Sequence, residues 1–281
     1  MRPRPPVGRR LINLMVSGLA AGSALLGLLA LTGILSVVLI RGAGAVNLSF
    51  FTQLPTPPGV AGGGLANALV GTLVITLLAT VLGVPIGLLA GVYLGEFGQQ
   101  SRLANATRFA VNVLMGVPSI IIGVFIYTLI VIPMKGFSGY AGALALAIIM
   151  LPIVARTAED MLRLIPDSLR ESGLALGAPR WRVTLAIVFR AAKAGLITGV
   201  CLAVARVSGE TAPLLFTALN SPYWPRSLGE PTPNLTVTVF NYAMSPYPDW
   251  QRMAWGASLL ITLGVLALTL LARLSLRERQ P

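Results

Sequence analysis

Residues 66–94 read ANALVGTLVITLLATVLGVPIGLLAGVYL and contain no charged side chain. A helix needs about 20 apolar residues to cross a hydrocarbon core about 30 Å thick, so this stretch is long enough to span a membrane. Glycines recur every four residues from Gly83 to Gly95, the residue just after this stretch, which predicts a close helix–helix contact. Five other segments meet or nearly meet the same length condition: 12–40, 109–132, 138–155, 183–212 and 254–272. The sequence therefore predicts an all-α, polytopic membrane protein with six transmembrane helices.

The composition supports this class of protein. Of the 281 residues, 55% are apolar and 11% are charged, and the mean hydropathy is +0.81. Soluble domains carry about 25% charged residues. The net charge of +12 would also suit a nucleic-acid-binding protein, but the basic residues fall between apolar spans, where they set membrane topology. The first apolar run is too long for a signal peptide, whose apolar core has about 7–15 residues, so we expect a retained span.

Several kinds of chemistry lack the residues they need. The chain has no histidine, which excludes histidine metal ligands and histidine general bases. Its one cysteine, Cys201, allows no intrachain disulfide. No glycine-rich loop ends in Gly-Lys-Ser or Gly-Lys-Thr, the pattern that cradles nucleotide phosphates. We therefore expect no catalytic residue, metal ion or cofactor in this chain, with any ATP and Mg bound by a partner subunit.

The distribution of basic residues predicts the orientation in the membrane. Sixteen of the 21 lysines and arginines fall on one side of the predicted spans and four on the other, and Arg206 lies within a span. The sixteen are Arg2, Arg4, Arg9, Arg10, Arg102, Arg108, Arg156, Arg163, Arg170, Arg180, Arg182, Arg190, Lys193, Arg273, Arg277 and Arg279; the four are Arg41, Lys135, Arg226 and Arg252. Because basic residues are enriched in cytoplasmic loops, both termini are predicted to be cytoplasmic.

Residues 206–215, RVSGETAPLL, place a cation and an anion inside an apolar stretch. Arg206 and Glu210 are four residues apart and would share one face of a helix. Charged groups at membrane depth cost roughly 2.5–3.5 kcal/mol each on insertion scales, and they usually face a bundle interior or a water-filled path. The pair therefore indicates a polar translocation path, with a buried structural ion pair as the alternative.

Residues 159–182 form the one sizeable hydrophilic stretch between spans on the cytoplasmic side. Turn-forming residues at 165–167 and 177–179 predict a short surface helix between them. Residues 171–181, ESGLALGAPRW, resemble the EAA loop of ABC importer permeases, in which a glutamate is followed six residues later by Gly-Ala, here Glu171, Gly177 and Ala178. The resemblance implies a coupling helix that sits in a cleft of the ATP-hydrolysing subunit, with Gly177 permitting a tight turn. Two departures are Ser172-Gly173 for the usual Ala-Ala, and Phe189-Arg190 where many permeases have Leu-Pro.

Residues 205–218, ARVSGETAPLLFTA, are similar to the signature of PstA-type permease subunits of phosphate importers, and 241–247 and 249–251 extend the resemblance over roughly 66–273. It implies a type I ABC importer permease core at 66–273. Residues 1–65 would hold a cytoplasmic tail, the first transmembrane helix and an extracytoplasmic linker, and residues 274–281 a second cytoplasmic tail. The implied partners are a homologous second permease, two copies of an ATP-binding subunit and an extracytoplasmic phosphate-binding protein, in a bacterial inner membrane.

The same resemblance suggests roles for three residues on the substrate path. The guanidinium of Arg206 suits the geometry of an oxyanion. Glu210 would neutralise it when the path is empty, and Thr211 would donate a hydroxyl hydrogen bond to phosphate. Alternatives stay open: the ion pair joins the two permeases, the substrate is molybdate, sulfate or phosphonate, the chain is an ATP-independent anion transporter or channel, or it anchors a signalling complex.

Overall fold

A computed structural model describes residues 7–98 and 101–277, and it is helical with no strand in these ranges, which confirms the predicted all-α class. The longer helices are α1 (Val7–Ala43), α3 (Ala66–Val92), α4 (Arg102–Gly116), α5 (Ser119–Ile126), α7 (Gly139–Arg163), α8 (Asp167–Ala175), α10 (Phe189–Ser208), α12 (Leu235–Ala243) and α13 (Pro248–Arg277). The shorter ones are α2 (Leu48–Thr52), α6 (Ile132–Met134), α9 (Arg180–Val183) and α11 (Ala212–Leu215). Three π-helical turns, η1 (Tyr93–Phe97), η2 (Tyr127–Val131) and η3 (Thr184–Val188), continue or join these helices.

Within the described residues, five helices are long and apolar enough to cross a membrane: Gly8–Ala43, Ala66–Phe97, Gly139–Arg163, Arg180–Ser208 and Pro248–Ala272. The remaining predicted span, 109–132, which is the third along the chain, is broken. Here Arg102–Gly116 and Ser119–Met134 meet at 101°. Pro118 lies at the break, and Val117 before it has the extended backbone that a following proline favours. The third span is therefore a bent pair rather than one straight helix.

The glycine repeat of α3 lies against α7, as predicted. At Gly87, a side chain would place its Cβ 2.8 Å from Cβ of Val154 and 2.9 Å from the carbonyl oxygen of Leu151. Real Cβ atoms do not approach this closely, so only glycine fits. The small residues let the two helices pack with their backbones close together. As a result α3 and α7 form the tightly packed centre of the bundle.

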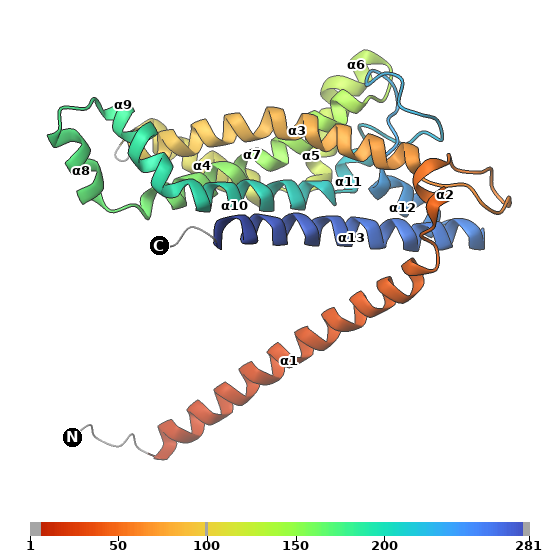
Figure 1. Ribbon diagram of the computed structural model, residues 1–281, viewed down its shortest axis with the longest axis horizontal. Helices are drawn as coiled ribbons and strands as arrows, with labels where there is room; N and C mark the ends of the chain where they lie inside the picture. The colour runs from red at the N-terminus through yellow and green to blue at the C-terminus, as the bar shows by residue number, and fades with distance from the viewer. Residues whose placement is uncertain (1–6, 99–100, 278–281) are drawn as a thin grey trace.

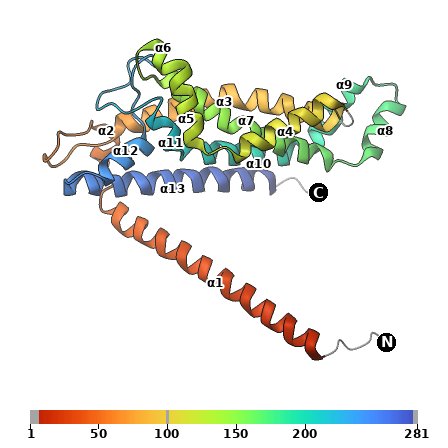
Figure 2. The ribbon, with the colours of Figure 1, turned by 180° about the vertical axis from the view of Figure 1, so that it is seen from behind.

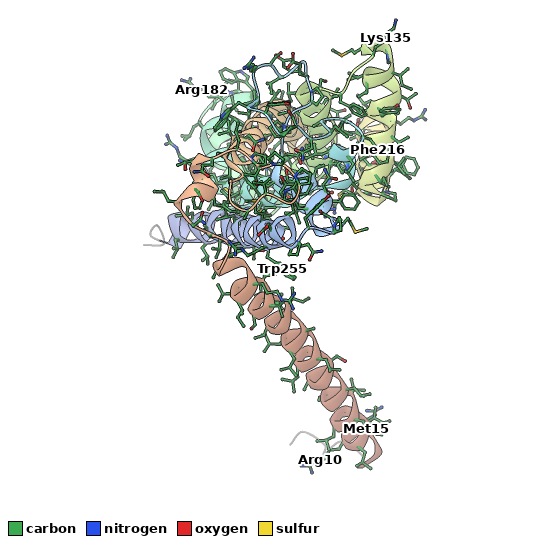
Figure 3. The ribbon with its side chains drawn as sticks, turned by 90° about the vertical axis from the view of Figure 1, so that its right-hand side faces the viewer. Arg10, Met15, Lys135, Arg182, Phe216 and Trp255 are labelled. Atoms are coloured by element: carbon green, nitrogen blue, oxygen red, sulfur yellow. The ribbon has the colours of Figure 1, made fainter. Side chains whose placement is uncertain are left out.

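Helix α1 extends away from the bundle, and its most apolar stretch has no buried residue (Figures 1 and 2). It meets α13 near its C-terminal end, where the guanidinium of Arg41 lies 5.2 Å from the ring centre of Trp255. Figure 3 shows Met15 and Arg10 far from this junction. An apolar helix exposed all round is suited to lipid or to another chain.

The two ends of the molecule carry different parts of the chain. The first turn of α1, the last turn of α13 and helix α8 lie at one end, whereas α2 and α6 lie at the other (Figure 1). The segments predicted to be cytoplasmic thus share one end of the molecule, while their side of the membrane stays a prediction. Arg2, Arg4 and Arg279 lie outside the described residues, and α13 continues to Arg277, beyond the predicted end of the permease core.

Candidate functional site

A cavity of about 490 Å³ lies where the bent pair α4–α5 meets α7 and α10. Two arginines line it, Arg156 from α7 and Arg206 from α10, and no aspartate or glutamate is among its lining residues. Ser119, the first residue of α5, adds a hydroxyl group to the wall. The other lining residues are Leu114, Met115, Gly116, Val117, Pro118, Ile122, Ile149, Pro152, Ile153 and Thr157.

Arg206 lies in the last turn of α10, and its side chain is 64% exposed. Its Nε is 3.9 Å from Oε1 of Glu210, close to the limit for an ion pair. The prediction that both residues share one helix face is wrong, because α10 ends at Ser208 and Gly209 caps it. Pro213 then lies in the first turn of α11, where its missing N–H costs no hydrogen bond. The pair therefore meets across a helix end.

The structure brings one of the three predicted path residues to the cavity. Glu210 and Thr211 are not among the lining residues. The main-chain carbonyl of Glu210 accepts a hydrogen bond of 2.9 Å from the hydroxyl of Thr236 in α12. Thr211 is the residue before α11, and its carbonyl accepts the N–H groups of Leu214 and Leu215. Both residues thus connect α10 to the segments that follow it.

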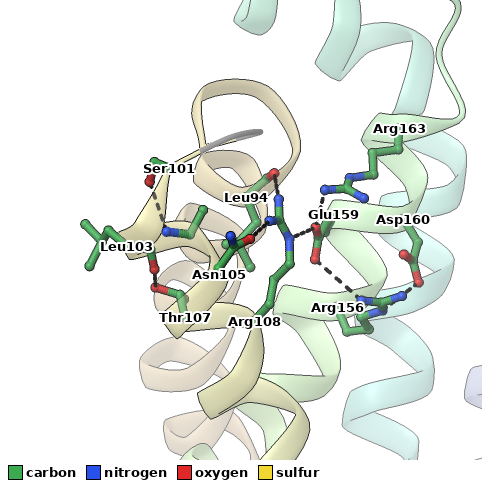
Figure 4. Close-up of polar contacts among 11 residues, drawn as sticks. Leu94, Ser101, Leu103, Asn105, Thr107, Arg108, Arg156, Glu159, Asp160 and Arg163 are labelled. Carbon is green, nitrogen blue, oxygen red and sulfur yellow. Dashed lines mark hydrogen bonds and ion pairs between the residues drawn. The ribbon is translucent and has the colours of Figure 1, made fainter.

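Arg156 belongs to a charge network that the sequence analysis missed (Figure 4). Its Nε lies 3.1 Å from Oδ2 of Asp160, and its second contact is to Glu159 at 3.7 Å. The Glu159 side chain is 1% exposed and also receives Arg108 of α4 at 2.7 Å and Arg163 at 2.8 Å. The local signal was the spacing of Arg156, Glu159, Asp160 and Arg163 by three and four residues at the end of an apolar span.

The electrostatic balance of the cavity favours an anion. In this network three arginines share two carboxylates, which leaves a net positive charge beside the cavity. Arg206 adds a second guanidinium, and its carboxylate partner Glu210, at 3.9 Å, is not among the residues that line the cavity. Guanidinium groups bind oxyanions through paired, charge-assisted hydrogen bonds, and these strengthen where water is scarce. The cavity wall therefore offers the positive charge and the hydrogen-bond donors that a small oxyanion requires.

The second candidate region is the hydrophilic segment around α8, where the predicted turn-flanked helix is confirmed. Pro166 precedes α8, and Gly177 after it has a φ of +80°, the left-handed conformation that favours glycine. Glu171 and Gly177 are exposed and Ala178 is half-buried. Gly173 is buried, and a Cβ there would lie 2.7 Å from Cδ1 of Ile187. Gly173 thus lets α8 pack closely on η3, where a larger residue would require the Ile187 side chain to shift.

Residues 83–278 match the family described as "Binding-protein-dependent transport system inner membrane component". The chain belongs to this family. It is 47% identical over 279 residues to the "Phosphate transport system permease protein PstA" of Yersinia pestis, covering 99% of this chain and 95% of the relative. The protein of the same name from Haemophilus influenzae is 47% identical over 272 residues, covering 97% and 96%.

The fold is also found among solved transporters. An inward-facing structure of the MetNI methionine ABC transporter contains a chain that superposes with a TM-score of 0.61, covering 78% of this chain and 95% of that one at 20% identity. This likeness concerns the fold alone. Together the matches confirm the predicted resemblance to PstA-type permeases and the type I ABC importer permease fold.

Proposed function

We propose that this chain is the transmembrane permease subunit of an ATP-driven inorganic phosphate importer, forming part of the translocation path and coupling it to a separate ATPase. The observation that carries the proposal is the cavity lined by two guanidinium groups and no carboxylate. The printed function of relatives 47% identical over nearly the whole chain supports phosphate as its anion.

In this proposal Arg206 and Arg156 replace water around a phosphate ion in the cavity. An ion that leaves water needs compensating hydrogen bonds, and two guanidinium groups supply them. Glu210, 3.9 Å from Arg206, keeps that arginine partly neutralised when the cavity is empty, so phosphate is not held too tightly. Thr211 is a hydroxyl donor for a later position on the path. The alternative for Arg206 and Glu210 is a contact with the second permease.

The segment that contains α8 would couple this path to ATP hydrolysis. Glu171, Gly177 and Ala178 lie in or just after the exposed helix α8, at one end of the bundle. ATP and Mg would be bound by two copies of a partner ATPase. Closure of the two copies would move the permease helices as rigid bodies, so that the path opens alternately to the two sides of the membrane. A homologous second permease and an extracytoplasmic phosphate-binding protein complete the complex. No catalytic step is assigned to this chain.

The proposed location is a bacterial inner membrane with both termini in the cytoplasm. A reporter enzyme active only outside the cytoplasm, fused after Pro281, should be silent, whereas the same reporter inserted near Gly62 should be active. Sixteen basic residues on one side are the physical reason. Active reporter at Pro281 with silent reporter at Gly62 would overturn the orientation and the assignment of α8 to the ATPase side.

The proposed function is tested by uptake of labelled phosphate into vesicles that contain the purified complex. We expect uptake that requires ATP and the binding protein and that excess unlabelled phosphate, but not sulfate or molybdate, suppresses. Uptake without ATP would favour an ATP-independent transporter. Equal suppression by sulfate or molybdate would show that the substrate is another oxyanion.

A further inference from the structure

A buried carboxylate at the end of α3 has no role in the path described above. Glu96 lies in the π-helical turn η1, and its side chain is 4% exposed. Its partner is Arg170 of α8, whose Nη2 is 2.6 Å from Oε1 and whose Nε is 3.2 Å from both carboxylate oxygens. A buried charge is costly unless it is paired and hydrogen-bonded, and this pair meets both conditions.

The same guanidinium also holds the end of α7. Nη2 of Arg170 donates to the carbonyl of Leu162 at 2.7 Å, and Nη1 donates to that of Ile165 at 2.5 Å. The hydrogen bond to Glu96 raises the pKa of Arg170 above its ordinary value, and that value already keeps the guanidinium charged at physiological pH. One side chain of α8 is therefore attached to the ends of two central helices, α3 and α7.

A second arginine binds the same turn from the other side of Gly177. Arg180, the first residue of α9, donates from Nη2 to the carbonyl of Glu96 at 2.9 Å. Its guanidinium also lies 5.7 Å from the ring centre of Phe97. The surface segment is thus fixed to η1 both before and after its tight turn.

From η1 the contacts continue toward the cavity. A Cβ at Gly95 would lie 3.2 Å from Cβ of Leu162, and α3 packs along α7 through its glycine repeat. Closely packed helices transmit a displacement rather than absorb it. Helix α7 carries Arg156 into the cavity wall. These contacts form a continuous route from α8 through Glu96 and Leu162 to α7, the helix that carries Arg156 in the cavity wall.

From these contacts we propose that the Arg170–Glu96 pair is the mechanical link between the ATPase-facing helix α8 and the path, which makes Arg170 and Glu96 positioning residues for transport. The inference rests on the proposed function, because it takes α8 as the part that the ATPase moves. It assigns a role to the side of α8 that faces the bundle, whereas Glu171 and Gly177 are exposed.

The test compares two variants in the complete reconstituted complex. Glu96→Gln removes the charge on α3 and leaves the hydrogen bonds from Arg170 to the carbonyls of Leu162 and Ile165. Asp167→Asn removes the other carboxylate that contacts Arg170. The Asp167 side chain is 84% exposed and lies within α8 itself. We expect phosphate moved per ATP hydrolysed to fall roughly fivefold or more in Glu96→Gln, a modest value for coupling between sites, and to stay unchanged in Asp167→Asn.

Arg170→Lys gives a graded check. Lysine keeps the charge, but its single ammonium group cannot contact Glu96 and the carbonyls of Leu162 and Ile165 as arginine does. The amount of phosphate moved per ATP hydrolysed should therefore lie between the values for wild type and Glu96→Gln. A ratio equal to wild type in both Glu96→Gln and Arg170→Lys would overturn the link. So would a parallel loss of ATP hydrolysis, transport and assembled complex, since that pattern describes a purely structural pair.

A second measurement does not depend on the identity of the substrate. Ser119→Cys, made together with Cys201→Ala, places one thiol on the cavity wall for labelling. ATP should change its labelling rate in this background and should change it much less when Glu96→Gln is added. An equal ATP effect in both proteins would contradict the link. Failure of the proposed function would show differently, as absence of phosphate uptake by the wild-type complex.

Discussion

Gly177→Asp is expected to abolish phosphate uptake while the chain remains in the membrane. Gly177 has a φ of +80°. A residue with a Cβ atom raises the conformational free energy by roughly 1–2 kcal/mol when its backbone is left-handed. Apart from its two chain neighbours, no atom of the described residues lies within 4 Å of a Cβ placed there, so the substitution causes no clash with that part of the permease. The damage therefore falls on the direction of α8 and on the surface offered to the ATPase. Uptake is measured at membrane levels matched by immunoblotting.

Gly177→Asn is the matched control for this prediction. Asparagine has nearly the same shape as aspartate, tolerates left-handed backbone and carries no charge. We expect partial uptake from Gly177→Asn, since only the added charge distinguishes the two variants. Normal uptake by a well-inserted Gly177→Asp protein would contradict the coupling role of the segment.

The features that the sequence predicted well depend on neighbouring residues. The helix at 167–175 is bounded by Pro166 on one side and Gly177 on the other. Each of these residues restricts or frees the backbone angles at its own position, so its effect is local. The contact between α3 and α7 was likewise visible as a glycine repeat along one helix. In such cases a local pattern has one main structural solution.

Other features could not be predicted because they depend on where distant segments meet. Arg156 was counted only as a basic residue beside a span, although it shares a cavity with Arg206 on another helix. Glu96 and Arg170 are 74 residues apart, and neither is unusual in its own surroundings. Their pairing follows from the packing of α8 on η3, which brings Arg170 to the turn that continues α3, and no local spacing encodes this.

The error at Arg206 and Glu210 has a different origin. A four-residue spacing places two residues on one face only if the helix continues between them, and the predicted span ran on to residue 212. Gly209 and Pro213 instead end α10 and begin α11. At Pro118 the outcome is the one that a proline within a span predicts, because one apolar run there becomes two helices that meet at 101°. In both places a backbone-directing residue outweighed hydrophobicity.

Arg206→Gln is expected to reduce phosphate uptake at least about tenfold, since a hydrogen bond to a charged group contributes roughly 1.5–3 kcal/mol. The neutral amide leaves Arg156 as the one charged donor on the cavity wall among the described residues. Arg190→Gln is the matched control, because Arg190 lies exposed in the same helix, away from the cavity. Unchanged uptake in Arg206→Gln at matched membrane levels would remove Arg206 from the path.

Exchanging the two charges separates a path role from a structural ion pair. In the protein carrying Arg206→Glu with Glu210→Arg, the attraction between the side chains can form again. A structural pair therefore predicts recovery of uptake relative to Arg206→Gln. A path role predicts none, because position 210 lies beyond the end of α10 and does not line the cavity, while a carboxylate at 206 would repel the anion.

Glu210→Gln alone should tighten phosphate binding and slow its release, since the arginine then has no neutralising partner at 3.9 Å. Uptake in all three proteins, measured over a range of phosphate concentrations, decides between the two roles.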